Sequence, residues 1–288
     1  MNGFSERILL STDGSEDAIR ATEAALDLAN RSDSELHVVH VWTDVPGFAH
    51  KFVKAELRRQ GQEKLDEQVG KIEDSGGRVT QAHLRGGRTS NEIIALSDEI
   101  RAGLLVVGSR GLGTVKRILM GSHSEEIVHH AHVPVLVIRG GESLWPPSRI
   151  IMGEDFSDDA RRAGDLAASI GSHYGSRGLL VYAHPDLPEM PEGEAREEIQ
   201  DMRERDEARL EERATELEGI LGSRPDIRVS DGYPASVLLE AVQGEERPSF
   251  VAVGSQALSG VRRTRMGSVS TKVVTASRGP VLVCPRVE

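Results

Sequence analysis

The sequence predicts two tandem doubly wound α/β domains, each built on a five-stranded parallel sheet of strand order 3-2-1-4-5. Apolar runs typical of strands alternate with helical patterns along the first half of the 288 residues. A segment rich in glycine and proline, residues 140–147, interrupts this alternation. The same pattern then starts again, which indicates one domain present twice. We expect the domains to span residues 1–140 and 148–288.

Five apolar runs predict the strands of the first half. They lie at residues 7–12, 36–42, 78–84, 104–107 and 135–138. Small apolar residues recur at helical spacing from Glu16 to Asn30, and Ser15 is the predicted N-cap of that helix. Further helical patterns end near Gly76, follow the turn predicted at Gly86-Gly87, and begin at Gly121.

The predicted topology brings two sequence signals together. Asp13 follows the first strand, and Gly108 comes directly after the fourth. In a sheet of order 3-2-1-4-5, the ligand crevice lies between the carboxyl ends of these two strands. We therefore expect Asp13 and Gly108 to lie on the two sides of a binding crevice.

The second half repeats the first segment by segment. Residues 149–160 repeat 7–18, and residues 179–184 repeat 37–42. Residues 251–274 repeat the glycine-rich stretch 106–128, and residues 278–285 repeat 132–139. The charged segment between Pro188 and Gly222 predicts an amphipathic helix with a solvated outer face. The final strands, Val135–Ile138 and Val281–Cys284, are edge strands in this order. We expect the halves to pair through them across a pseudo-two-fold axis.

The stretch from Leu104 to Arg139 carries the most specific chemical signal. Glycines at positions 108 and 111 follow an apolar run and let backbone N–H groups approach an anion with no Cβ in the way. Gly121 and Ser122 open a helix, whose N-terminus adds unpaired N–H groups and the positive end of a dipole. Hydroxyls of Ser122 and Ser124 add further donors. The alternative is that these glycines only turn a strand into a helix.

Two common phosphate-binding motifs do not fit this stretch. Lys116 lies after Thr114, whereas a P-loop needs the lysine immediately before the hydroxyl residue. Gly111-Leu112-Gly113 lacks the third glycine of a dinucleotide-binding fingerprint. The stretch therefore belongs to neither class.

The pattern Gly108-x2-Gly111-x9-Gly121-Ser122, followed by Ser124 and a proline-led strand, resembles the ATP-binding signature of the universal stress protein family. The resemblance covers nearly the whole chain, in both halves, and indicates a tandem member. It implies a Rossmann-like fold similar to that of the adenine nucleotide alpha hydrolases. It also implies ATP, with Mg²⁺, as the cofactor, although some members of the family bind no nucleotide.

The resemblance assigns site residues in the first half. Asp13 corresponds to an aspartate near adenine and ribose, and Val41 to a valine whose backbone meets adenine. The phosphate positions correspond to Gly108, Gly111, Gly121, Ser122 and Ser124. His123 lies within the same loop, where we expect a ligand contact.

The second half keeps most of these positions but departs at two. The corresponding residues are Asp155, Ala183, Gly254, Gly267, Ser268 and Ser270. Ala183 replaces the valine, and Ala257 replaces the second glycine. A methyl group at Ala257 hinders close backbone approach, so we expect the first half to bind nucleotide more tightly. Three arginines within this loop either hold phosphates or form an exposed basic face: Arg262, Arg263 and Arg265.

Composition argues against several classes of function. A net charge of −11 and a pI near 5.5 disfavour binding of DNA by the whole surface, so we expect no nucleic-acid partner. No apolar run approaches the length of a membrane span, and the start of the chain has no signal-peptide pattern, so we expect no membrane association. The single cysteine, Cys284, fits a reducing compartment, and we expect a cytoplasmic protein.

These observations favour an ATP-binding stress-response protein in which the nucleotide alters partner or domain contacts. Two alternatives stay open: a nucleotide-free interaction scaffold of the same fold, and a slow ATPase or self-phosphorylating enzyme. The sequence shows no base and nucleophile pair, so we predict no catalytic residue. His129, His130 and His132 lie near a helix end, where charge–dipole attraction is expected and a metal site is not. The resemblance also favours a homodimer of tandem chains.

Overall fold

The structure, a computed structural model, describes residues 6–43, 51–109, 120–139, 145–185, 194–243, 248–255 and 266–286. Among the candidate binding residues discussed above, Gly111, Ala257, Arg262, Arg263 and Arg265 lie outside these ranges. Residues 140–144, in the segment between the halves, also lie outside them.

Strands alternate with helices in both halves, as predicted. The first half contains β1 (Arg7–Ser11), α1 (Glu16–Ser32), β2 (Glu35–Thr43), α2 (Lys51–Asp74), β3 (Gln81–Gly87), α3 (Thr89–Glu99), β4 (Leu104–Gly108), α4 (Ser122–His130) and β5 (Val135–Ile138). The second half contains β6 (Arg149–Gly153), α5 (Asp158–Ser172), β7 (Arg177–His184), α6 (Glu194–Leu221), β8 (Asp226–Asp231), α7 (Pro234–Gln243), β9 (Ser249–Gly254), α8 (Ser268–Ala276) and β10 (Val281–Cys284). Ser15 caps α1 as predicted, because its side chain accepts a hydrogen bond from the N–H of Ala18.

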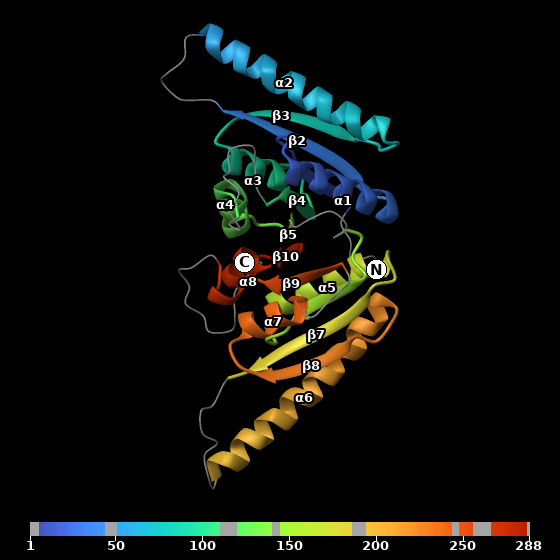
Figure 1. The fold of residues 1–288 in the computed structure, drawn as a ribbon, viewed down its shortest axis with the longest axis vertical. Helices are drawn as coiled ribbons and strands as arrows, with labels where there is room; N and C mark the ends of the chain where they lie inside the picture. The colour runs from blue at the N-terminus through green and yellow to red at the C-terminus, as the bar shows by residue number, and fades with distance from the viewer. Residues whose placement is uncertain are drawn as a thin grey trace.

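The ten described strands form one continuous sheet of order β3-β2-β1-β4-β5-β10-β9-β6-β7-β8 (Figure 1). Within each half the strands are parallel and follow the order 3-2-1-4-5, which confirms the predicted fold. β5 and β10 pair antiparallel between the halves, with Leu136 opposite Leu282. The prediction that the halves pair through their final strands is therefore confirmed.

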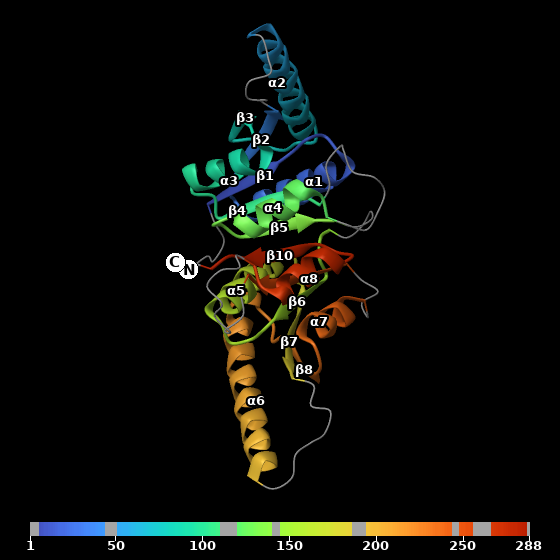
Figure 2. The ribbon, with the colours of Figure 1, turned by 90° about the vertical axis from the view of Figure 1, so that its left-hand side faces the viewer.

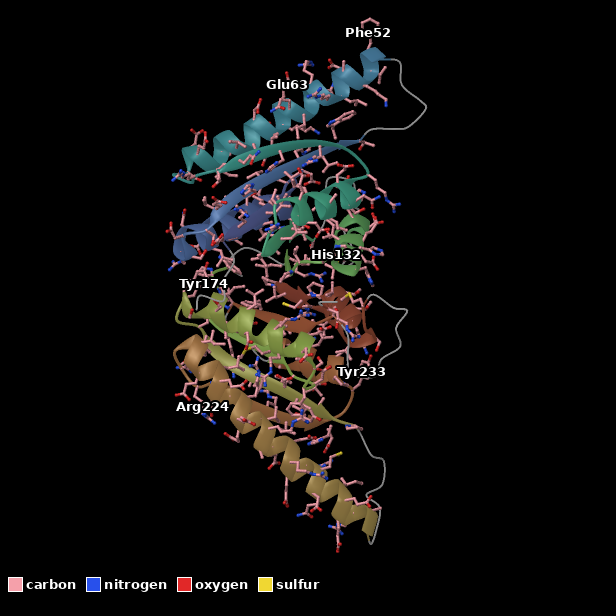
Figure 3. The ribbon with its side chains drawn as sticks, turned by 180° about the vertical axis from the view of Figure 1, so that it is seen from behind. Phe52, Glu63, His132, Tyr174, Arg224 and Tyr233 are labelled. Atoms are coloured by element: carbon pink, nitrogen blue, oxygen red, sulfur yellow. The ribbon has the colours of Figure 1, made fainter. Side chains whose placement is uncertain are left out.

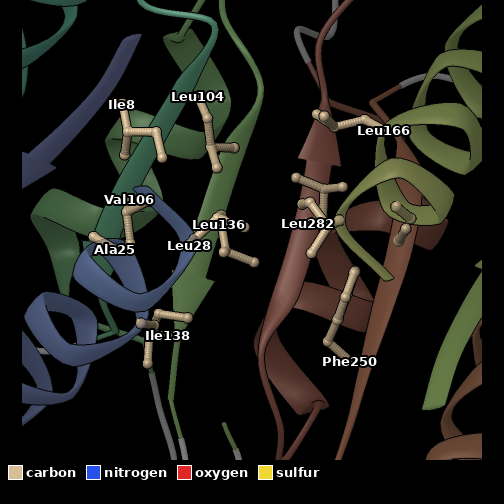
Figure 4. Close-up of a cluster of buried hydrophobic side chains, with 14 of the residues drawn as sticks. Ile8, Ala25, Leu28, Leu104, Val106, Leu136, Ile138, Leu166, Phe250 and Leu282 are labelled. Carbon is tan, nitrogen blue, oxygen red and sulfur yellow. The ribbon is translucent and has the colours of Figure 1, made fainter. Parts of the chain in front are cut away.

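Buried apolar side chains cover both faces of the sheet. Those of α1, α2, α5 and α6 pack on one face, and those of α3, α4, α7 and α8 pack on the other. On the first face, Leu136 of β5 and Leu282 of β10 belong to one cluster that continues from one half into the other (Figure 4). Because the central strands are buried on both faces, runs such as Val135–Ile138 are apolar throughout and do not alternate.

Strand β3 differs from its predicted position. It begins at Gln81 instead of residue 78, and it continues through Gly86 and Gly87, where the sequence predicted a turn. Parallel pairing with β2 continues as far as Gly87. Glycine suits position 86 because a Cβ there would lie 2.4 Å from the ring of Trp42. Packing within the sheet, and not a turn, therefore requires Gly86.

The long helices α2 and α6 lie at the two ends of the elongated molecule (Figures 1 and 2). The predicted apolar stripe of α6 is buried: Leu210, Ala214, Leu217 and Leu221. Exposed charged side chains pair with one another near its end, as Arg224 does with Glu211 (Figure 3). None of the described helices has both the length and the apolar character that crossing a membrane requires.

Side chains also join the two halves. Buried Arg139, which follows β5, donates a hydrogen bond to the carbonyl oxygen of Val274 near the end of α8. The indole of Trp145 donates to Asp27 of α1 at 3.1 Å and packs edge-to-face on Tyr174 of the second half. Contacts from both backbone and side chains therefore couple the halves.

Candidate functional site

A pocket of about 570 Å³ opens at the carboxyl ends of β6 and β9 in the second half. Its lining includes every second-half residue that was predicted to bind nucleotide: Asp155, Ala183, Gly254, Gly267, Ser268 and Ser270. These residues come from three strand ends and from the start of α8. The volume lies within the range typical of small-molecule sites.

This pocket has an apolar wall and a polar end. Val181, Leu238, Val253 and Met266 contribute the wall. The polar end is the N-terminus of α8, where Gly267 is the N-cap. An apolar wall suits the flat face of a base, and a helix N-terminus suits an anion. The sequence did not single out Leu238 or Met266, because a pocket-lining apolar residue looks the same as a core residue.

The first half brings its predicted residues together by the same topology. Ser11, the last residue of β1, pairs with Val107 of β4, so Gly108 reaches the same edge of the sheet as Asp13. Val41 of β2 also lies toward that edge, because β2 runs parallel to β1 and beside it. The predicted convergence of Asp13 and Gly108 therefore follows from the strand register.

The N-termini of α4 and α8 have matching geometry. Gly121 and Gly267 are the N-caps, with backbone angles of φ −69°, ψ 147° and φ −70°, ψ 160°. Any residue adopts these extended angles, so backbone conformation does not explain why both positions are glycine. In α4 the N–H groups of Ser122, His123 and Ser124 have no acceptor within the helix. Both Ser122 and His123 are exposed there.

Ser124 and Ser270 are held within the protein. Their hydroxyls donate to the carbonyl oxygens of Gly108 at 2.7 Å and Gly254 at 2.6 Å, and both serines are buried. Each hydroxyl hydrogen is thus used inside the fold. These residues offer an anion their backbone N–H, in place of the hydroxyl donor expected from the sequence.

Gly108 and Gly254 have a packing role. A Cβ at Gly108 would lie 2.7–2.9 Å from backbone atoms of Asp17 and Ala18 in α1. The same approach recurs between Gly254 and the first turn of α5, at 2.7 Å. In both halves, glycine lets the helix after the first strand lie against the end of the fourth strand. Packing is therefore a sufficient reason for glycine at these two positions.

Asp13 and Asp155 each close a turn at a strand end. The Oδ1 atom of Asp13 accepts a hydrogen bond from the N–H of Ser15 at 3.0 Å. The Oδ1 atom of Asp155 accepts one from the N–H of Ser157, also at 3.0 Å. Both aspartates are half-buried, so their carboxylates are fixed in orientation at the crevice and stay accessible.

Glu154 lines the second-half pocket but was not predicted to do so. Its carboxylate lies 3.3 Å from the guanidinium of Arg213, and both side chains are buried. Burial raises the pKa of Glu154, while the N–H of Phe156 and the charge of Arg213 oppose this shift. The corresponding residue of the first half is Thr12, so the repeat itself marks Glu154 as a difference between the two sites.

Histidine and carboxylate side chains form no metal centre in the described residues, where no group of three could hold an ion. His129 and His130 lie in the last turn of α4, as expected from their sequence position. His132 lies just beyond it, 2.9 Å from Asp98. The prediction that these three histidines lie near a helix end is confirmed.

Known proteins of one family are similar to this chain in both sequence and fold. The model of the universal stress protein family matches residues 5–139 and 147–285. A universal stress protein of Mycolicibacterium smegmatis is 28% identical over 292 residues, which cover 96% of each chain. Universal stress protein MJ0531 of Methanocaldococcus jannaschii is 30% identical over 141 residues, or 46% of this chain and 82% of that protein. The crystal structure of a universal stress protein from Archaeoglobus fulgidus has a TM-score of 0.69 and 25% identity, covering 98% of this chain and 99% of that one.

These matches agree with the structure in two respects. The family model matches once in each half, and each half forms the same doubly wound sheet. The relatives from M. smegmatis and A. fulgidus match along almost the whole length of this chain and of their own, so the similarity includes both halves. The chain therefore belongs to the universal stress protein family, as a member with two tandem domains.

Proposed function

We propose that this protein binds ATP in the strand-end crevice of each half and acts in stress responses as a nucleotide-dependent regulatory protein. The pocket of the second half carries the proposal. It gathers around one volume of about 570 Å³ the six second-half residues at positions where the family resemblance implies nucleotide contacts. A nucleotide needs an apolar surface and an anion site side by side, and this pocket offers both.

The proposed pose follows the chemistry of the lining. In the second half, the base lies against the apolar wall near Ala183, and Asp155 faces the ribose. The phosphates lie at the N-terminus of α8, near Gly267 and Ser268. The first half uses Asp13, Val41 and the N-terminus of α4 in the same way.

Mg²⁺ is expected to bind together with the ATP. This ion usually keeps several waters and takes phosphate oxygens with one or two carboxylates. Glu154 and Asp155 are carboxylates in the lining of the second-half pocket, and Asp13 occupies the position equivalent to Asp155. We propose no catalytic residue, and any hydrolysis of ATP is expected to be slow.

Calorimetry with ATP and the variant Gly121→Val/Gly267→Val tests this function. The extended angles at both N-caps accept valine without backbone strain, so we expect the variant to fold. A valine side chain occupies the space where the phosphates are proposed to lie. We expect wild-type protein to bind ATP and the variant to bind at least about tenfold more weakly.

The matched control is Gly70→Val/Gly219→Val. It adds the same side chains at helix positions where a new Cβ meets nothing within 4 Å. We expect the control to keep wild-type affinity for ATP. Absence of ATP binding by the wild type would leave a nucleotide-free scaffold, and unchanged affinity in the N-cap variant would contradict the proposed site.

We also propose that the two sites are unequal. The reason is the sequence difference between Gly111 and Ala257, which lie outside the described residues. A cost of about 1–2 kcal/mol for alanine in place of glycine corresponds to roughly tenfold weaker binding. The exchanges Gly111→Ala and Ala257→Gly test this, with the other site disabled by valine at its N-cap. If neither exchange changes the affinity, this glycine is not the cause of any asymmetry.

Assembly and location complete the proposal. The edges of β5 and β10 pair with each other within one chain, so the proposed homodimer requires a different surface. Light scattering that gives a particle of 31.3 kDa, one chain, would contradict the dimer. The single cysteine remains the reason for proposing a cytoplasmic location.

A further inference from the structure

A chain of hydrogen bonds connects three element ends at the first-half crevice. The hydroxyl of Ser109, the residue after β4, donates to the carboxylate of Asp17 in α1. The carbonyl oxygen of Ser109 accepts from the N–H of Gly121, the N-cap of α4, at 2.7 Å. Ser109 thus ties the start of α4 both to the end of β4 and to the first turn of α1.

The same arrangement recurs in the second half. The hydroxyl of Ser255 donates to Asp159 of α5 at 3.3 Å, and the carbonyl oxygen of Ser255 accepts from the N–H of Gly267 at 2.6 Å. The hydroxyl bonds join residues 92 and 96 positions apart in the two halves. Local secondary structure therefore does not produce them. Their recurrence in halves that differ at other pocket positions indicates a shared purpose.

Burial makes this contact costly unless it is complete. Asp17 and Ser109 are 3% and 1% exposed, and Asp159 and Ser255 are 5% and 3% exposed. A buried carboxylate is destabilising unless hydrogen bonds or a counter-charge satisfy it. Arg20 provides that counter-charge for Asp17, and Arg162 provides it for Asp159. We call the pairs Ser109–Asp17 and Ser255–Asp159 the latch. A pair of apolar side chains would fill the same space without the free-energy cost of burying a carboxylate, so packing alone does not explain the polar latch.

We propose that Ser109 and Ser255 are positioning residues for the phosphates. With Asp17 and Asp159, they hold the N-termini of α4 and α8 against the strand ends, in the orientation that phosphates require. This inference rests on the proposed ATP binding. The latch touches the helix N-terminus and not the apolar wall, so it affects the phosphates and leaves the base untouched.

The test compares ATP with adenosine, which has no phosphate, in the full-length Ser109→Ala/Ser255→Ala variant. Calorimetry is expected to show a dissociation constant for ATP that is raised at least about tenfold. The constant for adenosine, measured by competition, is expected to stay within about twofold of wild type. A variant that is merely less stable would not separate the two ligands in this way.

A second pair of substitutions guards against misfolding. Asp17→Asn/Asp159→Asn keeps a carbonyl oxygen that accepts the serine hydroxyl, so its affinity for ATP is expected to lie between those of wild type and the serine variant. The asparagine is nearly the same size as the aspartate. Full loss of ATP binding in this milder variant, together with loss of adenosine binding, would reduce the latch to a structural role.

The matched control is Ser97→Ala/Ser176→Ala. It removes two buried hydroxyls that donate to carbonyl oxygens at 2.7 Å, one in each half. Ser97 lies in α3 next to Asp98, which contacts His132 just beyond the C-terminus of α4. We expect this control to keep the wild-type ratio of ATP to adenosine affinity. Wild-type protein that binds no ATP would overturn both this inference and the proposed function, whereas normal ATP binding by the serine variant would overturn this inference alone.

Discussion

Gly108 is a residue whose size decides how α1 packs. Gly108→Ala is expected to lower the free energy of unfolding by about 1–3 kcal/mol. Its Cβ would lie 2.7–2.9 Å from backbone atoms of Asp17 and Ala18, which cannot rotate away as a side chain can. Urea denaturation measures the change. The control Gly70→Ala lies in α2 with nothing within 4 Å and is expected to be neutral or stabilising by up to about 1 kcal/mol. Equal stability of Gly108→Ala and wild type would contradict the packing role.

Cys284 is the single thiol of the chain and lies in the central strand β10. Burial raises the pKa of this thiol to about 12, and its side chain is almost inaccessible. Because the thiolate is the reactive form, we expect no labelling by a thiol reagent near pH 8 in the folded protein. Mass spectrometry should find one label per chain after unfolding in urea. Rapid labelling of the native protein would show that β10 opens from β5.

At the scale of elements, two histidines join β2 to β3. The Nδ1 atom of His37 lies 3.1 Å from the Nε2 atom of His83, and the rings stack with an angle of 16° between them. Burial lowers the pKa of both imidazoles, although Glu35 partly opposes the shift at His37. The nearby charges of Arg7 and Arg85 act in the same direction as burial. The folded strand pair therefore favours neutral histidines.

This histidine pair predicts a loss of stability in weak acid. As pH falls below 6.5, the unfolded chain takes up protons on these residues before the folded chain does. Their contribution to stability is therefore complete above that pH and is lost as pH falls below it. Urea denaturation from about pH 7.5 to about pH 5.5 should show a shallower decline for His37→Gln/His83→Gln than for wild type. Exposed His132→Gln is the control, and identical slopes for all three proteins would exclude this origin.

At the scale of the whole molecule, the pairing of β5 with β10 makes the halves dependent on each other. All four residues of each strand are buried. Separate fragments 1–140 and 148–288, the proposed domain boundaries, would each expose an apolar edge strand. We expect the two fragments to reassociate when they are mixed, which size-exclusion chromatography detects. Two stable fragments that stay apart would show that the shared sheet adds little to either half.

A single substitution at Arg139 is expected to weaken the association of the two fragments without abolishing it. Its buried guanidinium donates to the carbonyl oxygen of Val274, near the C-terminus of α8 in the other half. Arg139→Ala in the first fragment leaves that contact unmade. We expect fragment association to weaken by about tenfold or more, because a charged hydrogen bond to a helix end is lost. The control is Arg59→Ala, on the exposed surface of α2 far from the second half, and association should not change.

The sequence predicted the architecture well because its signals are local. Strands buried on both faces need unbroken apolar runs, and helices on a sheet need apolar residues at helical spacing. The internal repeat established two copies of one domain, and the edge position of the final strands predicted their pairing. The error at β3 is also local in origin. The pair Gly86-Gly87 is typical of a turn, and only the close approach of Gly86 to Trp42 shows why glycine occurs there within a strand.

What the sequence determined by itself is the alternation of elements, their duplication, and a glycine pattern that marks the crevice. Only the tertiary structure decided which side chains meet there. It turned Ser124 inward to Gly108, placed Glu154 and Leu238 in a pocket wall, and joined Ser109 to Asp17 across 92 positions. The physical reason is that periodicity reflects the neighbours of a residue along the chain. A binding site depends on strand ends and helix starts that are distant in sequence, and these converge only when the sheet forms.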